Sequence, residues 1–160
     1  MKSKDAIVVG LVITSILVTV IRLYGQDALQ SSRIAGLRKL PELAIVMQPG
    51  GDRTVDTLTF KEIHDIVLVF LKSKLPLLKL SRGEDSTSWF AVEYRTAPNG
   101  GLVRVALYRW VTISGTGERA FVATWDNSLL VTDRFNRQDF KEALEQVLTN
   151  FAADYYRANP

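Results

Sequence analysis

The sequence predicts an α+β fold, in which a mostly antiparallel sheet of about five strands carries two helices on one face and follows an N-terminal membrane-targeting helix. Three observations lead to this prediction. Short apolar stretches with a period of two are separated by turns rich in Gly and Pro, as in strands. Two longer stretches repeat apolar residues at helical spacing. One face of the predicted strands is apolar and the other is mixed, so we expect helices on a single face.

The N-terminal segment, residues 6–21, contains sixteen residues and no charged side chain. Lys2 and Lys4 precede it, and Arg22 follows it. As a helix with a rise of ~1.5 Å per residue it would extend ~24 Å, slightly less than the ~30 Å hydrocarbon core of a bilayer. A short membrane-spanning helix and a secretory signal peptide both fit this segment, and a buried core segment is the remaining alternative.

Cleavage of residues 1–25 as a signal peptide is disfavoured, because Leu23 lies two positions before the best small residue, Gly25, and Arg22 interrupts the region. The chain has no cysteine, which excludes disulfides and a lipid anchor on an N-terminal cysteine. We therefore expect a retained signal-anchor and an extracytoplasmic domain, periplasmic or at the cell surface, which would be secreted if the N-terminus were cleaved. The residues that bound the membrane segment or could pack against other membrane helices are Ala6, Gly10, Thr14, Ser15 and Ile21.

The charge distribution gives no support to a nucleic-acid partner, and we predict none. The chain has 160 residues and a formal net charge of +3. Residues 1–25 hold three basic side chains and one acidic side chain, so the remainder is almost neutral. Polar and small side chains predict a linker over residues 26–40, followed by one α+β domain over residues 41–160.

The domain is predicted to begin with a strand, a helix and a second strand. Residues 43–47 form a short apolar run bounded by turn residues, which favours a buried strand. Thr59 and Glu62 have the spacing of a capping box, so a helix should begin after Thr59, and Pro76 should end it. Residues 77–80 predict the second strand.

The middle of the domain is predicted to be an antiparallel meander. Residues 89–96, 102–113 and 119–125 alternate apolar and polar side chains. Turn-forming residues at 98–101 and 114–118 connect them.

The last of these strands is expected to place Phe121 and Trp125 on the same face and to end at residues 126–127. Residues 129–131 are a candidate for a further short strand. A second amphipathic helix is predicted over residues 137–156. The predicted order of elements is therefore β-α-β-β-β-β-α.

Several short motifs match a known group of proteins in their layout. They are Gly36-Leu37, the strand from Leu43 to Met47, Leu58-Thr59, Asp65, Pro76-Leu77-Leu78, Phe151, Asp154-Tyr155 and Asn159-Pro160. This layout resembles small exported bacterial proteins of unknown function that have an N-terminal signal or anchor and one α+β domain. The resemblance implies export and a fold, and no activity. Leu68 and Val69 depart from it, because that pattern is charged there, and they predict a more buried helix.

No motif indicates catalysis, and we predict no catalytic residue, no metal site and no cofactor. His64 is the only histidine, which excludes a metal site built from several histidines. Its position beside Asp65, at the edge of the apolar face of the predicted helix, is typical of a surface or boundary residue and not of a base. Residues 114–118 connect two strands without a following helix, so they fit a hairpin turn better than a phosphate loop.

A binding surface on the sheet is the leading functional hypothesis. Aromatic and Arg side chains fall on the less apolar phase of the predicted strands, and they are Trp89, Arg95, Arg104, Tyr108 and Trp110. Such residues suit a protein partner or an apolar ligand. The alternative is that they stabilise the sheet through cross-strand pairs or lie under a loop.

The sequence therefore favours a non-enzymatic envelope protein, exported or anchored through residues 6–21, that binds a partner or an apolar ligand. One alternative is a small extracytoplasmic hydrolase with loop carboxylates, for which the candidates are Glu93, Glu118, Asp126 and Asp133. Another is an accessory subunit of a membrane complex.

Overall fold

A computed structural model describes residues 31–49, 58–81, 86–97, 100–132 and 136–160. The chain divides into two compact units, Met1–Arg33 and Ile34–Pro160, and the fold below is that of the second unit. The predicted membrane segment, residues 6–21, lies outside the described residues, as does Asp133. Across the described ranges, no helix combines the length and the apolar character needed to cross a membrane.

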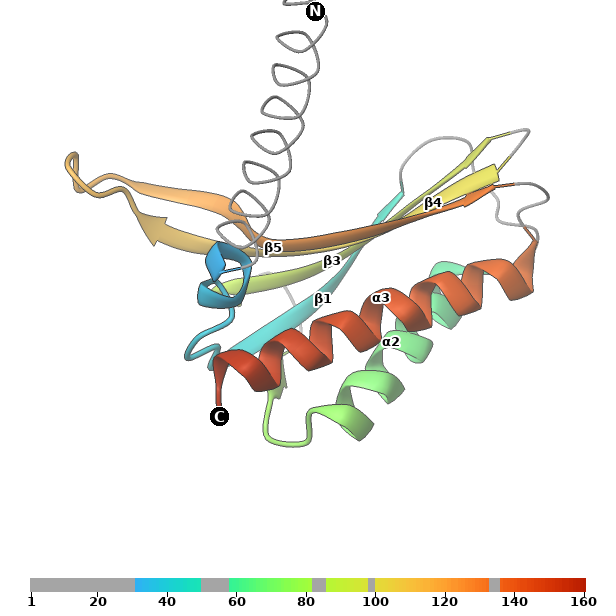
Figure 1. The fold of residues 1–160 in the computed structure, drawn as a ribbon, viewed down its shortest axis with the longest axis horizontal. Helices are drawn as coiled ribbons and strands as arrows, with labels where there is room; N and C mark the ends of the chain where they lie inside the picture. The colour runs from blue at the N-terminus through green and yellow to red at the C-terminus, as the bar shows by residue number, and fades with distance from the viewer. Residues whose placement is uncertain (1–30, 50–57, 82–85, 98–99, 133–135) are drawn as a thin grey trace, which may run out of the picture. The chain divides into compact units, whose positions relative to one another are not determined.

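The described part of this unit is an α+β domain with five strands and two helices, in the predicted order. The elements are β1 (Glu42–Pro49), α2 (Phe60–Lys74), β2 (Lys79–Ser81), β3 (Ser88–Ala97), β4 (Gly100–Thr112), β5 (Arg119–Thr132) and α3 (Arg137–Ala158). Figure 1 shows both helices on the same face of the sheet. The core lies between these two layers, and the opposite face of the sheet is called the outer face below.

The sheet is mixed, so the prediction of a mostly antiparallel sheet is wrong. The strand order is β2-β1-β3-β4-β5. β1 is parallel to both of its neighbours, β2 and β3, whereas β3–β4 and β4–β5 are antiparallel. The reason is the crossover through α2, which returns the chain to the end of the sheet at which β1 began. A local hydrophobic pattern locates strands and carries no information about this choice of neighbours.

The strand β2 begins later than predicted. Leu78 donates its backbone N–H to the carbonyl of Leu75 at 3.0 Å, so the chain still turns at that point. Leu77 is 95% exposed and lies outside any strand. The strand therefore begins at Lys79 and ends at Ser81.

The helix α2 begins at the predicted capping box. Thr59 Oγ1 accepts the backbone N–H of Glu62 at 3.2 Å, and Glu62 Oε2 accepts the backbone N–H of Thr59 at 2.8 Å. The backbone N–H and the hydroxyl of Thr59 both donate to Glu62 Oε2, and together with the hydrogen bond from Arg137 they hold the pKa of Glu62 below its usual value. The expectation that Val69 makes this helix more buried is wrong, because Val69 is 67% exposed and only the side of the helix that faces the sheet is buried.

The helix α3 is fixed to the sheet by a buried hydrogen bond between Trp125 and Asp154 and by the aromatic rings packed around it. Trp125 Nε1 donates to Asp154 Oδ2 at 3.0 Å inside the core. Phe151 packs edge-on against Trp125 and Phe90, with ring centroids 5.0 and 4.7 Å away. A buried carboxylate is costly unless it is hydrogen-bonded, so this contact specifies how α3 lies on β5.

A β-bulge interrupts the pairing of β4 with β5. Leu107 pairs with Trp125 and Tyr108 pairs with Ala123, so Thr124 is an extra residue in β5. Its hydroxyl Oγ1 donates to the carbonyl of Leu107 at 3.3 Å. The extra residue reverses the alternation of side chains along the strand.

Two predictions about β5 are wrong because of this bulge. Trp125 faces the core, where it is 2% exposed, whereas Phe121 pairs with Trp110 on the outer face. The two residues therefore lie on opposite faces. The strand also continues through Asp126 and Asn127, which pair with β4, and includes the segment predicted as a separate strand.

The end of the predicted linker packs closely against this bulge. Leu37 and Leu40 are buried in the core. A Cβ atom on Gly36 would lie 2.2 Å from the backbone oxygen of Thr124, so only glycine fits this close approach. Arg109 Nη1 donates to the carbonyl of Gly36 at 2.9 Å, and burial lowers the pKa of this guanidinium.

We expect the substitution Gly36→Ala to destabilise the protein by about 1–3 kcal/mol, because its methyl group would overlap a backbone oxygen that cannot move aside. Urea denaturation of both proteins would measure the difference in unfolding free energy. Ala153→Ser, on the exposed side of α3, is a surface control expected to change stability by less than about 0.5 kcal/mol. Equal stability of Gly36→Ala and the native chain would contradict the packing described above.

Candidate functional site

The outer face of the sheet collects the five side chains that the sequence singled out. The register places Trp89 opposite Tyr108 on β3 and β4, so both share one face. Arg104 lies opposite Glu93 on that same face, and Arg95 follows Glu93 by two positions. Trp110 belongs to the same phase of β4 as Tyr108. The five residues form two neighbouring groups rather than one.

The first group is an aromatic cluster built around Phe121, and consists of Trp89, Tyr108, Trp110 and Phe121. The Phe121 ring lies 5.0 Å from that of Trp89, 5.9 Å from that of Tyr108 and 5.3 Å from that of Trp110. Trp110 is 49% exposed, and the guanidinium carbon of Arg119 lies 5.3 Å from the centre of its ring. The cluster is therefore open to solvent and carries a cation at its rim.

Sequence reasoning missed Phe121 and Arg119 as members of this surface. The position of the hairpin turn could have placed both residues on this face. Ile113 and Glu118 close the turn through the hydrogen bond from the Ile113 N–H to the Glu118 carbonyl, 2.8 Å long. Counting outward from that turn places Thr112 opposite Arg119 and Trp110 opposite Phe121, as observed.

The second group is a charged cluster that consists of Glu93, Arg95, Arg104 and Asp126. Arg95 donates to Glu93 Oε1 from Nε at 2.9 Å and from Nη2 at 2.7 Å. Arg104 donates to Glu93 Oε2 at 3.4 Å and to Asp126 Oδ2 at 3.3 Å. Burial acts to lower the pKa of Arg104, but attraction to Tyr108, Asp126 and Glu93 raises it overall.

The carboxylates proposed for a hydrolase do not form a catalytic arrangement in the described residues. Glu93 and Asp126 come together, but Arg104 lies between them and binds an oxygen of each. Both oxygens of Glu93 accept hydrogen bonds from arginine side chains, so Glu93 is held as an ion-pair partner and not as a general base. Glu118 lies apart, in the hairpin turn.

The single histidine contributes no site either. His64 Nδ1 is 3.5 Å from Asp65 Oδ1, and both side chains are largely exposed. Within the ranges that the structure covers, no three His, Asp or Glu side chains are grouped closely enough to hold a metal ion. Residues 114–118 form the predicted hairpin turn, with Gly115 and Gly117 at φ values of 105° and 73°.

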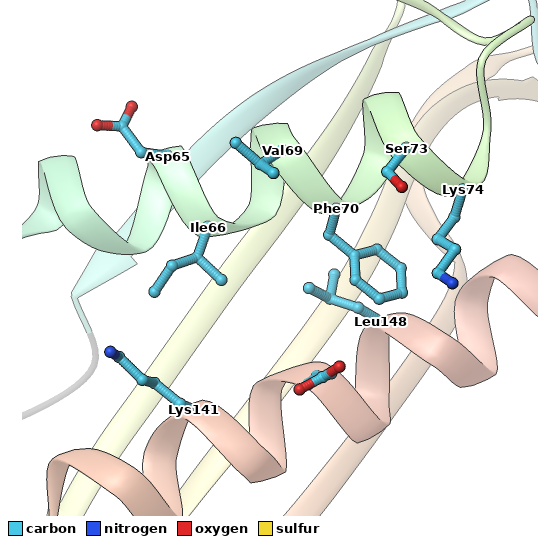
Figure 2. A pocket seen from close by; sticks show the side chains of 9 residues that line it. Asp65, Ile66, Val69, Phe70, Ser73, Lys74, Lys141 and Leu148 are labelled. Carbon is cyan, nitrogen blue, oxygen red and sulfur yellow. The ribbon is translucent and has the colours of Figure 1, made fainter.

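A groove between α2 and α3 is a second surface feature, which sequence reasoning did not anticipate. Its volume is about 560 Å³. It is lined by the apolar side chains of Ile66, Val69, Phe70 and Leu148, with polar and charged side chains from Asp65, Ser73, Lys74, Lys141 and Glu145. Figure 2 shows Phe70 and Leu148 facing each other across it. The sequence signal for the groove was the group Ile66, Val69 and Phe70. These residues extend the apolar surface of α2 beyond the side chains that pack into the core.

No protein-family model matches the chain. No curated protein matches it either. Solved structures with a partly similar arrangement include an uncharacterized protein, 11% identical, covering 76% of this chain and 94% of its own, with a TM-score of 0.39. A minor lipoprotein from Acinetobacter baumannii is 12% identical, with 74% and 91% covered and a TM-score of 0.32. A protein from Xanthomonas campestris is 11% identical, with 73% and 81% covered and a TM-score of 0.31. Likeness at this level assigns neither a family nor a function.

Proposed function

We propose that this chain is a non-enzymatic binding protein of the bacterial envelope, held at the membrane by residues 6–21, whose outer sheet face binds a protein partner. The observation that carries the proposal is the aromatic cluster around Phe121, four large rings on the face of the sheet opposite α2 and α3. Such rings are ordinarily buried in a core or in an interface. The partner would supply the apolar surface that covers them.

The chemistry beside the cluster describes the partner further. Trp, Tyr and Arg side chains dominate the binding energy of protein interfaces. Arg119 makes a cation–π contact with Trp110 and no ion pair with a described residue. An acidic side chain of the partner would complement it. The two carboxylates and two arginines of the charged cluster cancel in net charge, so this cluster would orient the partner rather than attract it.

The location of the protein rests on the sequence of residues 6–21, which is uncharged and long enough to approach the thickness of a bilayer core. A domain attached there would be exposed to partners in the envelope. The weak cleavage site favours retention of the segment over its removal.

Site-specific photocrosslinking in the native host tests the partner surface. A benzoylphenylalanine in place of Trp110 should crosslink to one discrete protein, whereas the same probe in place of Leu77, which is 95% exposed, should not. The captured protein, once identified by mass spectrometry and purified, should bind the native chain about tenfold more tightly than Phe121→Ala. Equal crosslinking at both positions, or equal affinity for Phe121→Ala with its fold intact by circular dichroism, would remove the proposal.

Cell fractionation with intact-mass measurement tests the location. We expect the full chain, including residues 1–25, in the membrane fraction, released by detergent and retained in alkaline carbonate, because an apolar helix across the bilayer is not an electrostatic attachment. A soluble protein whose mass lacks the N-terminal segment would show a cleaved signal peptide instead.

Binding of an apolar small molecule is a second candidate function, and the groove between α2 and α3 is the observation that favours it. Its volume of about 560 Å³ falls in the range of small-molecule sites, about 300–1,000 Å³. Lys74 and Lys141 line it, and neither makes an ion pair with a described residue. An alkyl chain with an anionic head would fit the apolar centre and one of these ammonium groups.

Methyl NMR spectra titrated with dodecanoate test this second candidate. We expect shifts at Ile66, Val69 and Leu148, below the concentration at which dodecanoate forms micelles. Val69→Asp should weaken binding at least about tenfold, because it adds a negative charge to the groove, while Leu77→Asp serves as an exposed control with unchanged binding. Shifts confined to other surfaces, or equal effects of the two substitutions, would exclude the groove as the binding site.

A further inference from the structure

The strand β5 leaves a long sheet edge without a partner strand among the described residues. It runs from Arg119 to Thr132, lies last in the strand order and pairs only with β4. The opposite edge is different, because β2 spans only Lys79–Ser81, and the neighbouring part of β1 ends in Pro49, which lacks a backbone N–H. An unpaired edge offers a row of backbone donors and acceptors to another strand.

Beyond the bulge at Thr124, β5 lacks the usual protection of such an edge. Proteins normally shield a long edge with lysine, proline or inward-pointing charges, and β5 contains neither lysine nor proline. Its two charged residues are engaged on the outer face, Arg119 over the Trp110 ring and Asp126 with Arg104. They are therefore not available to repel an approaching strand.

Two adjacent apolar side chains near the C-terminal end of β5 are exposed. Leu129 is 37% exposed and Leu130 is 68% exposed, and successive strand residues point to opposite faces. A strand added beside them would cover both. The bulge at Thr124 bends β5 and breaks its ladder, and the longer regular part of the strand is the one that follows it, residues 125–132.

The sequence of this part is complementary to itself in one antiparallel register. Opposed residues must share a face, so a two-fold axis passes through a residue position. An axis at Leu129 places this leucine against its own copy and places Ser128 opposite the partner's Leu130. An axis at Ser128 would instead set the charged Asp126 opposite the partner's Leu130. The first register keeps Asp126 away from the leucines, and an axis at Leu130 would shorten the ladder to residues 128–132.

We propose that two copies of this chain join through antiparallel pairing of their β5 edges, with the two-fold axis at Leu129, to form one continuous sheet. In the part of the chain that the structure describes, each copy has a single long edge of this kind, so the pairing uses both edges and closes at two copies instead of growing into a filament. The surface used is the edge of the sheet, so this inference does not depend on the partner proposed for the outer face.

The absence of cysteine from the chain makes a direct test possible. The full chain, purified in detergent, should have the mass of two copies by light scattering. Leu129→Cys should form a disulfide-linked dimer under mild oxidation, because the axis brings the two sulfur atoms together. Leu77→Cys, at a 95% exposed position outside the sheet, should remain monomeric on the same gel. A monomer at every concentration, or equal crosslinking of both variants, would overturn the proposal.

A charge pair tests the register and separates the edge from the membrane segment. Leu130→Lys should weaken the dimer at least about tenfold, because an ammonium group then occupies the edge that must pair. Adding Ser128→Glu to the same chain should restore the dimer, because each glutamate faces the partner's lysine in the proposed register. A dimer that persists undiminished in Leu130→Lys would assign dimerisation to another surface such as residues 6–21. Failure of the double variant to recover would overturn the Leu129 axis.

Discussion

The β-bulge at Thr124 is the constraint on which both faces of the sheet depend. On its C-terminal side Trp125 points into the core, where its indole N–H is satisfied by Asp154. On its N-terminal side Phe121 points outward and gathers the aromatic cluster. A regular strand would place both rings on one face, and either the core would lose its largest side chain or the outer face would lose the centre of its cluster. One extra residue therefore gives β5 two different roles.

The bulge also explains why the segment before β1 belongs to the domain. Gly36 sits against the carbonyl of Thr124, and Leu37 beyond it enters the core. Asn159, at the end of α3, donates to the Leu37 carbonyl at 3.1 Å and accepts the Lys39 N–H at 3.1 Å. Residues from the two ends of the domain thus meet at this point. Gly36, Leu37 and Asn159 are among the motifs by which the chain resembles small exported proteins, and their roles here are in packing.

Local features of the fold could be read from the sequence, and features that depend on distant residues could not. The capping box at Thr59 and the first residues of both helices follow from neighbouring residues, so they appear as predicted, whereas α3 ends at Ala158 and not at Tyr156. The parallel pairing of β1 and the bulge at Thr124 depend on contacts between distant segments, and a period-two pattern is equally compatible with either outcome. Val69 shows the same limit, because its burial depends on how far α3 extends over α2.

The candidate surface could be predicted in part for the same reason. Trp89, Tyr108 and Trp110 lie in β3 and β4, which contain no extra residue. Their side chains therefore alternate regularly, and their shared face was correctly deduced. Phe121 lies beyond an irregularity in β5, and its face was wrong. The bulge also divides β5 between two surfaces, with Phe121 on one side and the exposed Leu129 and Leu130 on the other. Because these positions are separate along the strand, a partner on the outer face and a second copy at the edge would not compete for the same residues.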